Sequence, residues 1–234
     1  MSGERAVVLL SGGMDSATAA AWARARWSWV GALSVDYGQR HRAELAAAAR
    51  VAARLALAEH RVVGVDLRAF GGSALTDELE VPKNRENIGE GIPVTYVPAR
   101  NTVLLALLLA FAETREARHL VIGANVLDYS GYPDCRPDFL RAFEAVANLG
   151  TKAGREGLRF SVHAPLLHLT KAGIVRLGHK LGTPFELTFS CYDPPMEGIH
   201  CGSCDACRLR RQGFVEAGIP DPTQYAERAA PLPT

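Results

Sequence analysis

The fold of this chain is decided by one stretch, Val7-Val8-Leu9-Leu10-Ser11-Gly12-Gly13-Met14-Asp15-Ser16-Ala17-Thr18. Its four apolar residues predict a buried parallel strand, and Ser-Gly-Gly ends that strand. The alanine-rich residues 17–23 predict a helix, so the small polar residues lie in a strand-to-helix turn. The N–H groups and the helix dipole at such a turn favour an anion. With three hydroxyl groups nearby, the expected ligand is a phosphate; the alternative is an ordinary capped turn.

The composition of the turn narrows the class of nucleotide site. The sequence matches neither G-x-x-x-x-G-K-[ST] nor G-x-G-x-x-G, which argues against a Walker-type NTPase and against a dinucleotide fingerprint. We expect Gly13 to use a positive φ and to let a phosphate approach, so that a branched side chain there would block binding. A bare carboxylate at Asp15 would repel a phosphate, so we expect it to act through Mg²⁺ or to cap the helix.

The overall composition excludes several classes of function. The chain has 234 residues, of which 48% are hydrophobic and 22% charged, as in soluble globular proteins. A net charge of +1 gives no reason to expect nucleic acid as a partner. No apolar run approaches the roughly 18 residues of a membrane span, and we see no signal-peptide pattern. We therefore expect a cytoplasmic protein without a membrane partner, in which cysteines serve as metal ligands or nucleophiles rather than in disulfides.

Strands and helices are expected to alternate along the chain. After the first pair, the pattern predicts strands at 29–35, 60–65, 119–122 and 160–164, and helices at 40–57, 101–114, 137–149 and 170–181. This alternation predicts an α/β protein with a doubly wound, mostly parallel sheet that binds ligands at the carboxyl ends of its strands. The long segment 66–98 interrupts it and is expected to be a lid or binding loop, or else a loose excursion. We place a domain boundary after residue 187, with a smaller unit at 188–234.

Four cysteines in the smaller unit have the spacing of a metal site. Cys191, Cys201, Cys204 and Cys207 spell C-x9-C-x2-C-x2-C, which allows a tetrahedral thiolate site. Zinc is the preferred ion, one per chain, and four thiolates leave no open position, so its role is expected to be structural. An iron–sulfur cluster or dithiol redox chemistry are the alternatives. Cys135 lies outside this set, and His200 is expected to be a bystander.

Three polar stretches follow predicted strands or precede a predicted helix. They are Asp-Tyr-Gly-Gln-Arg-His-Arg at 36–42 followed by Glu44, Tyr-Val-Pro-Ala-Arg-Asn at 96–101, and Asp-Tyr-Ser-Gly-Tyr-Pro-Asp-Cys-Arg-Pro at 128–137. Each alone is compatible with a solvated loop. All three are expected at the carboxyl edge of the sheet, beside the Ser-Gly-Gly turn.

Together, the Ser-Gly-Gly-x-Asp-Ser turn, these three stretches and the cysteine spacing resemble the 7-cyano-7-deazaguanine (preQ0) synthase family. That family lies within the N-type ATP pyrophosphatases, and the resemblance runs from about Val7 to Tyr225. It implies a Rossmann-like fold of the adenine nucleotide α-hydrolase type. It also implies the ATP-dependent conversion of 7-carboxy-7-deazaguanine and ammonia into the nitrile, a C–N-forming ligase reaction of queuosine biosynthesis. The carboxylate and then the amide would be adenylated, with no covalent protein nucleophile. We also expect a homodimer.

The resemblance implies roles for residues by position. Those assigned to ATP and Mg²⁺ are Leu9, Leu10, Ser11, Gly12, Gly13, Met14, Asp15, Ser16, Ala17, Thr18 and Gly123. Those assigned to catalysis are Asp15, Ser16, Arg100 and Lys171. Those assigned to the deazapurine are Asp36, Tyr37, Gln39, Arg42, Tyr132, Asp134 and Arg136. A deazaguanine needs an acid on its polar edge and a ring to stack on, which Asp134 with Tyr132 or Asp36 with Tyr37 would supply. Arg42 or Arg136 would clamp the carboxylate.

Three alternatives remain on the sequence alone. A related enzyme could adenylate the same deazapurine and stop at an amide with another amine. A tRNA-thiolation enzyme shares the phosphate turn and often has cysteine pairs, but it would need a reactive cysteine near the turn and a basic surface. The non-enzymatic alternative is a zinc-ribbon interaction module on a nucleotide-binding scaffold.

Overall fold

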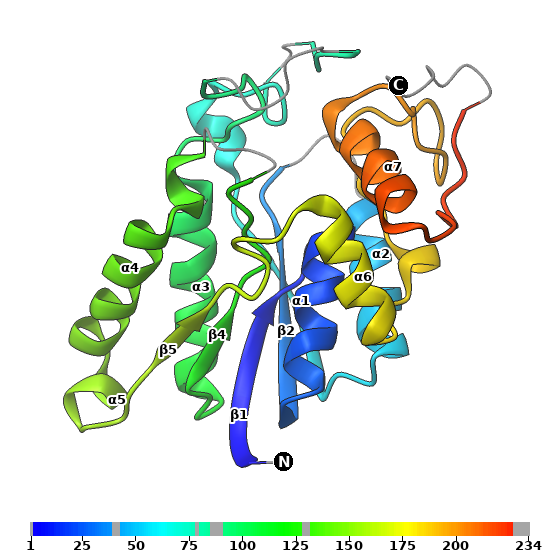
Figure 1. Cartoon of the computed structure of the whole chain (residues 1–234). Helices are drawn as coiled ribbons and strands as arrows, with labels where there is room; N and C mark the ends of the chain where they lie inside the picture. The colour runs from blue at the N-terminus through cyan, green and yellow to red at the C-terminus, as the bar shows by residue number, and fades with distance from the viewer. Residues whose placement is uncertain (1, 39–42, 78–79, 85–90, 128–131, 227–234) are drawn as a thin grey trace.

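The computed structural model describes residues 2–38, 43–77, 80–84, 91–127 and 132–226 and shows a five-stranded, wholly parallel sheet between two layers of helices (Figure 1). The strand order is β3-β2-β1-β4-β5. The strands are β1 (Ser2–Leu9), β2 (Trp27–Asp36), β3 (Glu59–Gly64), β4 (His119–Val121) and β5 (Ser161–His163). The doubly wound α/β fold expected from the sequence is confirmed.

The helices are α1 (Met14–Arg24), α2 (Ala43–Arg54), α3 (Arg100–Thr114), α4 (Pro137–Gly150), α5 (Lys152–Arg155), α6 (Lys171–Lys180) and α7 (Asp205–Ala217), with 3-10 turns η1 (Leu67–Phe70), η2 (Pro133–Cys135) and η3 (Phe185–Leu187). Helices α1, α2, α3, α4 and α6 occupy predicted stretches, with small shifts at their ends, and α5 and α7 lie outside those stretches. Helix α2 ends earlier than predicted because Ala56 adopts a φ of 50°. As expected, Thr170 caps α6: its side chain accepts a hydrogen bond from the N–H of Gly173.

Alternate residues of β1 face two separate hydrophobic cores. Ala6 and Val8 belong to a core shared with α1, α2 and α6, whereas Val7 and Leu9 belong to one shared with α3 and α4. Figure 1 shows these two helix layers on opposite sides of the sheet. A central strand that is buried on both faces explains the continuous apolar run in the sequence.

The strand order reverses beside β1. From β1 the chain moves outward through β2 to β3, then crosses to β4 and β5 on the other side. Helices α1 and α3 therefore leave for opposite faces of the sheet, and a crevice opens between them at the carboxyl ends of the strands. Many of the functional residues predicted from the sequence line a cavity at this edge.

The C-terminal segment is packed against the main body of the protein. Helix α7 lies along α6, and its Phe214 is buried in the core that α1 and α2 share. The fully buried guanidinium of Arg210 donates hydrogen bonds to the Thr188 hydroxyl (2.7 Å) and the Phe185 carbonyl (3.1 Å), which fixes the start of the segment. The division of the chain after residue 187 stays a prediction.

Parts of the long segment 66–98 contact the cysteine-bearing unit. The N–H of Asn84 donates to the carbonyl of Ser203 (2.9 Å), and Lys83 forms an ion pair with Asp193 (2.6 Å). In the ranges that the structure describes, we find no helix with the length and apolar character needed to cross a membrane.

Candidate functional site

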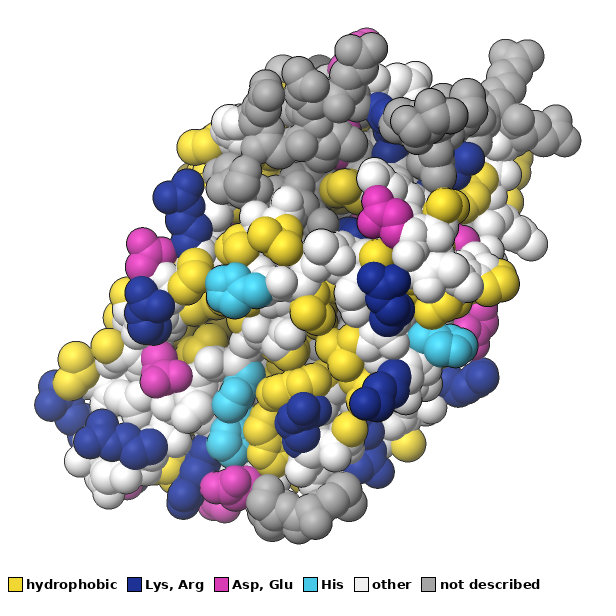
Figure 2. All heavy atoms as spheres, viewed as in Figure 1, with side chains coloured by type: hydrophobic (Ala, Val, Ile, Leu, Met, Phe, Trp, Pro, Cys, Tyr) yellow, Lys and Arg dark blue, Asp and Glu magenta, His cyan; other side chains and the backbone are white. Residues whose placement is uncertain are grey.

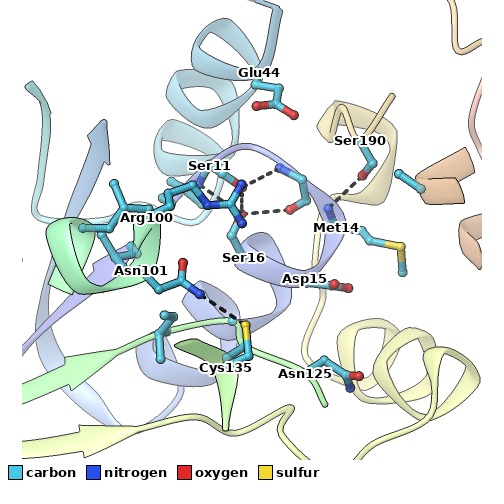
Figure 3. Close-up of a pocket in the computed structure, with 18 of the residues that line it drawn as sticks. Ser11, Met14, Asp15, Ser16, Glu44, Arg100, Asn101, Asn125, Cys135 and Ser190 are labelled. Atoms are coloured by element: carbon cyan, nitrogen blue, oxygen red, sulfur yellow. Dashed lines mark hydrogen bonds between the residues drawn. The ribbon is translucent and has the colours of Figure 1, made fainter. Parts of the chain in front are cut away.

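A cavity lies at the carboxyl ends of β1, β2 and β4, where the strand order reverses (Figure 3). Its polar and charged lining comes from segments that are distant in sequence. These residues are Ser11, Asp15, Ser16, Tyr37, Glu44, Arg100, Asn101, Asn125, Tyr132, Cys135, Lys171, Ser190, Cys191 and Tyr192. Leu9, Leu10, Gly13, Met14 and Gly123, all assigned to ATP from the sequence, line it as well. The cavity therefore combines residues of the turn 11–16, called the phosphate turn below, with residues of all three predicted polar stretches and with residues 190–192 of the cysteine segment (188–207).

The glycine that needs special backbone freedom is Gly12, not Gly13. Gly12 has a φ of +93°, and a Cβ there would overlap the Glu44 carbonyl oxygen. Gly13 has an ordinary φ of −75°, and a Cβ added at this position would make only normal contacts, the nearest at 3.5 Å from the Ser190 hydroxyl. The expectation of a positive φ at Gly13 is therefore wrong, because the chain makes its sharp reversal one residue earlier, against α2.

Two serine side chains close the turn. The Ser16 hydroxyl donates to the carbonyl of Gly13 (3.0 Å) and accepts from the N–H of Ser11 (3.2 Å). The hydroxyls of Ser11 and Ser16 are 3.0 Å apart. These hydrogen bonds fix the shape of the turn before any ligand binds.

Three residues of the predicted ATP set do not line the cavity: Gly12, Ala17 and Thr18. Helix α1 begins at Met14, so Ala17 and Thr18 fall on its core-facing side, and both are fully buried. The Thr18 hydroxyl donates to the carbonyl of Met14 (2.8 Å) instead of pointing toward a ligand. The assignment of these three residues to ATP stays a prediction, but the cavity does not include them, and for Ala17 and Thr18 this is because α1 turns both side chains into the core.

The N-terminus of α1 opens into the cavity and is joined there to the cysteine segment. The first helical bond of α1 runs from the N–H of Ala17 to the carbonyl of Gly13, so the N–H groups of residues 14–16 have no partner within the helix. The N–H of Met14 donates to the Ser190 hydroxyl (3.3 Å), and the N–H of Phe189 donates to the Gly12 carbonyl (2.9 Å). This end of the helix has the donors and dipole of an anion site.

Asp15 and Lys171 form an ion pair at the edge of the turn. The Lys171 ammonium donates to both carboxylate oxygens, at 2.9 and 3.1 Å, and its side chain is only 10% exposed. Gly13 is the N-cap of α1 and no side chain caps it, so the expected capping role of Asp15 is wrong. Lys171 is the first residue of α6, and the start of this helix places the side chain within hydrogen-bonding distance of Asp15 in the turn.

Arg100 begins α3 and brings a fixed positive charge to the cavity. Its guanidinium lies 5.8 Å from the ring centre of Tyr37. Desolvation opposes its charge, but the phenols of Tyr37, Tyr132 and Tyr192 and the Asp134 carboxylate outweigh it and raise the pKa of Arg100. The cation is therefore permanent in this site.

The residues predicted for the deazapurine divide into two groups. Tyr37 and Tyr132 line the cavity, and the Tyr132 hydroxyl is bonded to that of Thr95 (3.0 Å). The neighbouring acids make hydrogen bonds within the protein. Asp36 accepts a hydrogen bond from the N–H of Gly38 (3.2 Å), and the buried Asp134 accepts one from the N–H of Asn101 (2.9 Å).

Of the three remaining predicted residues, only Arg136 lies in the described part of the chain, and it does not line the cavity. Arg136 is exposed and serves as the backbone N-cap of α4. Gln39 and Arg42 lie outside the described residues.

Glu44 is the charged residue that sequence reasoning left without a role. It lies in the first turn of α2, and Figure 3 shows its side chain above the phosphate turn. Desolvation raises the pKa of Glu44 to about 7, against the opposing charge of Arg100. Its place at the end of the Asp-Tyr-Gly-Gln-Arg-His-Arg stretch was the available signal.

Cys135 and two asparagines complete the floor of the cavity. Asn101 donates to the Cys135 sulfur (3.2 Å), and Asn125 donates to the carbonyls of Leu166 (2.8 Å) and Leu169 (2.6 Å). Desolvation raises the pKa of the Cys135 thiol to about 11, so it is protonated at neutral pH and is a poor nucleophile.

The four predicted metal ligands come together at the edge of the cavity, which Cys191 also lines. The sulfurs of Cys191, Cys201, Cys204 and Cys207 all lie within 4.8 Å of one another, and His200 is not part of the group. The Cys201–Cys207 sulfur distance is 3.9 Å. Sulfurs at the corners of a tetrahedron with bonds of about 2.3 Å would be roughly 3.8 Å apart, so the cluster has the dimensions of a metal site.

Backbone donors around the cluster favour thiolates. The N–H of Cys201 points at the Cys191 sulfur (3.2 Å), and the N–H of Cys204 points at the Cys201 sulfur (3.3 Å). Hydrogen bonds of this kind orient ligands and stabilise their negative charge. The cysteine cluster can therefore bind a metal ion.

The fold and the cavity define the class: a parallel α/β protein with an anion-binding turn at the strand-order reversal and a four-cysteine metal motif beside it. The family model described as queuosine biosynthesis protein QueC matches residues 5–218. The chain belongs to this family.

Curated relatives agree with the family match. A 7-cyano-7-deazaguanine synthase of Anaeromyxobacter sp. (strain Fw109-5) is 63% identical, covering 96% of this chain and 97% of the relative. A 7-cyano-7-deazaguanine synthase 1 of Sphingopyxis alaskensis is 56% identical, covering 97% and 100%. Among solved structures, an NMN synthetase from Francisella tularensis is 18% identical with a TM-score of 0.48, covering 97% of this chain and 80% of that one, a likeness too distant to carry an argument.

The turn predicts a difference between two neighbouring glycine substitutions. Gly12→Ala should lower the free energy of unfolding by about 1–3 kcal/mol or more, because the positive φ is strained and the Cβ meets backbone atoms. Gly13→Ala should change it by less than about 1 kcal/mol, since its φ suits alanine. Urea unfolding of both variants measures this, and equal losses would contradict the assignment of the reversal to Gly12.

The cysteine cluster predicts a second pair of outcomes. Cys204→Ser should lose the bound metal and about 3 kcal/mol or more of stability, and Tm falls by roughly 2–4 °C per kcal/mol in a chain of this size. Cys135→Ser should leave the metal content unchanged. Elemental analysis alongside thermal melting tests both, and a Cys204→Ser protein with unaltered Tm but no turnover would make the metal catalytic.

Proposed function

We propose that this protein converts 7-carboxy-7-deazaguanine and ammonia into 7-cyano-7-deazaguanine at the expense of ATP, as a ligase of queuosine biosynthesis. The observation that carries the proposal is the near full-length identity of 56–63% to relatives named 7-cyano-7-deazaguanine synthase. The anion-binding turn inside a cavity with fixed cations and aromatic rings is compatible with this chemistry.

The reaction needs two activations of poor leaving groups. A carboxylate oxygen attacks the α-phosphorus of ATP and pyrophosphate leaves, which gives an acyl-adenylate. Ammonia attacks the acyl carbon, and AMP leaves with the oxygen. The amide oxygen is adenylated in the same way, and loss of AMP and a proton leaves the nitrile.

The residues of the phosphate turn and its cations are suited to the departing pyrophosphate. The N–H groups at the start of α1 and the Lys171 ammonium can bind its charge, while Arg100 faces charge that develops at the reacting carbon. Mg²⁺, when bound, would neutralise the phosphates; the Asp15 carboxylate and the Ser16 hydroxyl are the hard oxygen ligands it prefers. Catalysis would rest on positioning and charge.

The deazapurine has a matching apolar and aromatic surface. Tyr37 and Tyr132 line the cavity together with Leu75 and Leu104. Because Asp36 and Asp134 are engaged in local hydrogen bonds, we assign the tyrosines to ring packing and do not assign the acids to the polar edge of the base.

We assign zinc to the cysteine cluster, one ion per chain, with a structural role. Four sulfur ligands suit zinc and leave no position for a substrate. The ion would hold the segment carrying Ser190 and Tyr192 against the cavity. Reduced thiolates of this kind fit the cytoplasm, where we place the reaction.

Two related functions are less well supported. A tRNA-thiolation enzyme needs a reactive cysteine, but the pKa of the cavity thiol, Cys135, is raised. Figure 2 shows Lys and Arg side chains interspersed with Asp and Glu on the visible face, not the basic surface that an RNA partner would require. An enzyme that stops at an amide would share this cavity, and its product would differ in mass from the nitrile.

We also propose a homodimer formed through the outer face of α3. From residues 101 to 112 this helix carries no charge, and Thr102, Ala106 and Ala110 are exposed beside the half-buried Val103 and Leu107. These small and apolar residues form an uncharged face that an antiparallel copy of the same helix can cover, as a two-fold interface requires.

The ligase proposal predicts the products of ATP. The protein should form AMP and pyrophosphate only when 7-carboxy-7-deazaguanine is present, and with ammonium the deazapurine should appear as the nitrile in the mass spectrum. Lys171→Met should lower kcat by about 10²-fold, whereas Lys180→Met, exposed at the end of the same helix, should not. ADP and phosphate as the only nucleotide products would refute adenylation.

The dimer proposal predicts a change of mass. Ala106→Glu should halve the mass measured by light scattering, because it buries a charge in the two-fold contact. Ala49→Glu, exposed on α2 on the opposite face of the sheet, should leave the mass unchanged. A wild-type monomer, or equal behaviour of the two variants, would contradict this interface.

A further inference from the structure

Glu44 is a cavity carboxylate with no assigned task. Among the described residues that line the cavity, the only carboxylates are those of Asp15 and Glu44. Asp15 is paired with Lys171, but within the described ranges no hydrogen bond or ion pair engages the Glu44 carboxylate. A half-buried acid in this state retains the capacity to bind a cation or to accept a proton.

The backbone fixes Glu44 next to the phosphate turn. Its carbonyl oxygen would overlap a Cβ at Gly12, so α2 and the phosphate turn are in direct backbone contact. Figure 3 shows the carboxylate on the side of α2 that faces Ser11 and Met14. The other charged and titratable groups that line the described part of the cavity are Arg100, Tyr37, Tyr132, Tyr192, Asp15, Lys171, Cys135 and Cys191.

We propose that Glu44 binds the ammonium ion and accepts a proton from it, so that ammonia is released beside the adenylated carbon. This inference rests on the proposed ligase function and adds the group that prepares the nucleophile. The negative charge attracts the cation, and the position beside the phosphate turn places it near the carbon from which AMP leaves.

The step balances in protons and charge. Ammonium and the Glu44 carboxylate give ammonia and the neutral carboxylic acid. Ammonia's lone pair forms the C–N bond, the C–O bond to AMP breaks, and the extra proton on nitrogen passes to solvent. The proton affinity of Glu44 suits this role, because desolvation has already raised its pKa to about 7, well above that of a solvated glutamate.

The competing role for Glu44 would be recognition of the polar edge of the deazapurine. Its backbone contact with Gly12 places Glu44 beside the phosphate turn, whereas Tyr132, one of the two rings that we assign to the deazapurine, comes from the other layer of the fold. Tyr37, the second ring, is near enough to Glu44 to interact with it electrostatically. The two roles predict different dependences of the rate on the nucleophile. A residue that binds the edge of the deazapurine would affect the rate with every nucleophile equally, whereas a base for ammonium would affect only the ammonium-dependent rate.

The test compares ammonium with hydroxylamine, which is largely unprotonated at neutral pH and needs no base to become a nucleophile. Glu44→Gln should lower the ammonium-dependent rate at pH 7 by about 10²-fold and should leave hydroxamate formation, adenylation and the KM for the deazapurine close to wild type. Glu44→Asp should restore part of the ammonium rate. Glu156→Gln, exposed on the surface, is the matched control.

The pH profile gives an independent readout. With total ammonium constant, the wild-type rate should fall below about pH 7, because the protonated Glu44 cannot accept a proton, and should be level above it. The Glu44→Gln rate should instead rise tenfold per pH unit, in proportion to free ammonia. Equal losses with both nucleophiles, or a wild-type profile in Glu44→Gln, would overturn the inference; a wild type that forms no AMP would instead refute the ligase function.

Discussion

The reversal of strand order between β1 and β4 is the constraint on which the site depends. Two neighbouring parallel strands send their chains to opposite faces of the sheet, so no connection covers the space above their carboxyl ends. The N-terminus of α1 enters that space from one layer and Arg100, at the start of α3, from the other. A helix dipole and a permanent cation therefore converge without any long loop having to position them.

The cysteine segment adds a second support to the same edge. The bond from the N–H of Phe189 to the Gly12 carbonyl and the contact of Ser190 with Met14 join the phosphate turn to residues just before Cys191. Arg210 fixes the start of this segment by hydrogen bonds to the Thr188 hydroxyl and the Phe185 carbonyl. A metal at the four sulfurs, for which we propose a structural role, would thus act on the turn through these two hydrogen bonds.

The elements with strong periodic patterns were predictable from the sequence, and so were the residues whose chemistry is carried by spacing. The buried strand at Val7, the cap at Thr170 and the four cysteines needed only hydrophobic pattern, hydroxyl chemistry and sequence spacing. The sequence could not show toward which part of the protein each side chain points. Thr18 turns inward because α1 starts at Met14, a boundary that propensity does not resolve to one residue.

The same limit applies to the acids of the cavity. Asp134 is engaged by the N–H of Asn101, and Asp36 by that of Gly38, and both bonds depend on tertiary placement. Glu44 follows a recognisable polar stretch, but that stretch does not indicate its raised pKa, which arises from the atoms packed around the carboxylate. Desolvation is a property of the fold, so no pattern of letters along one segment could assign it.

At the contact between Gly12 and Glu44, the backbone of the phosphate turn packs directly against the backbone of α2, with no side chain between them. A single methyl group at residue 12 would overlap the Glu44 carbonyl oxygen. Neither the phosphate turn nor α2 can therefore move toward the other without displacing it. Any drift of α2 along the sheet would shift the turn with it, and any thickening of the turn would displace the carboxylate. A substitution at this contact therefore affects the phosphate turn and α2 together, and only substitutions that suit both elements are expected to be retained.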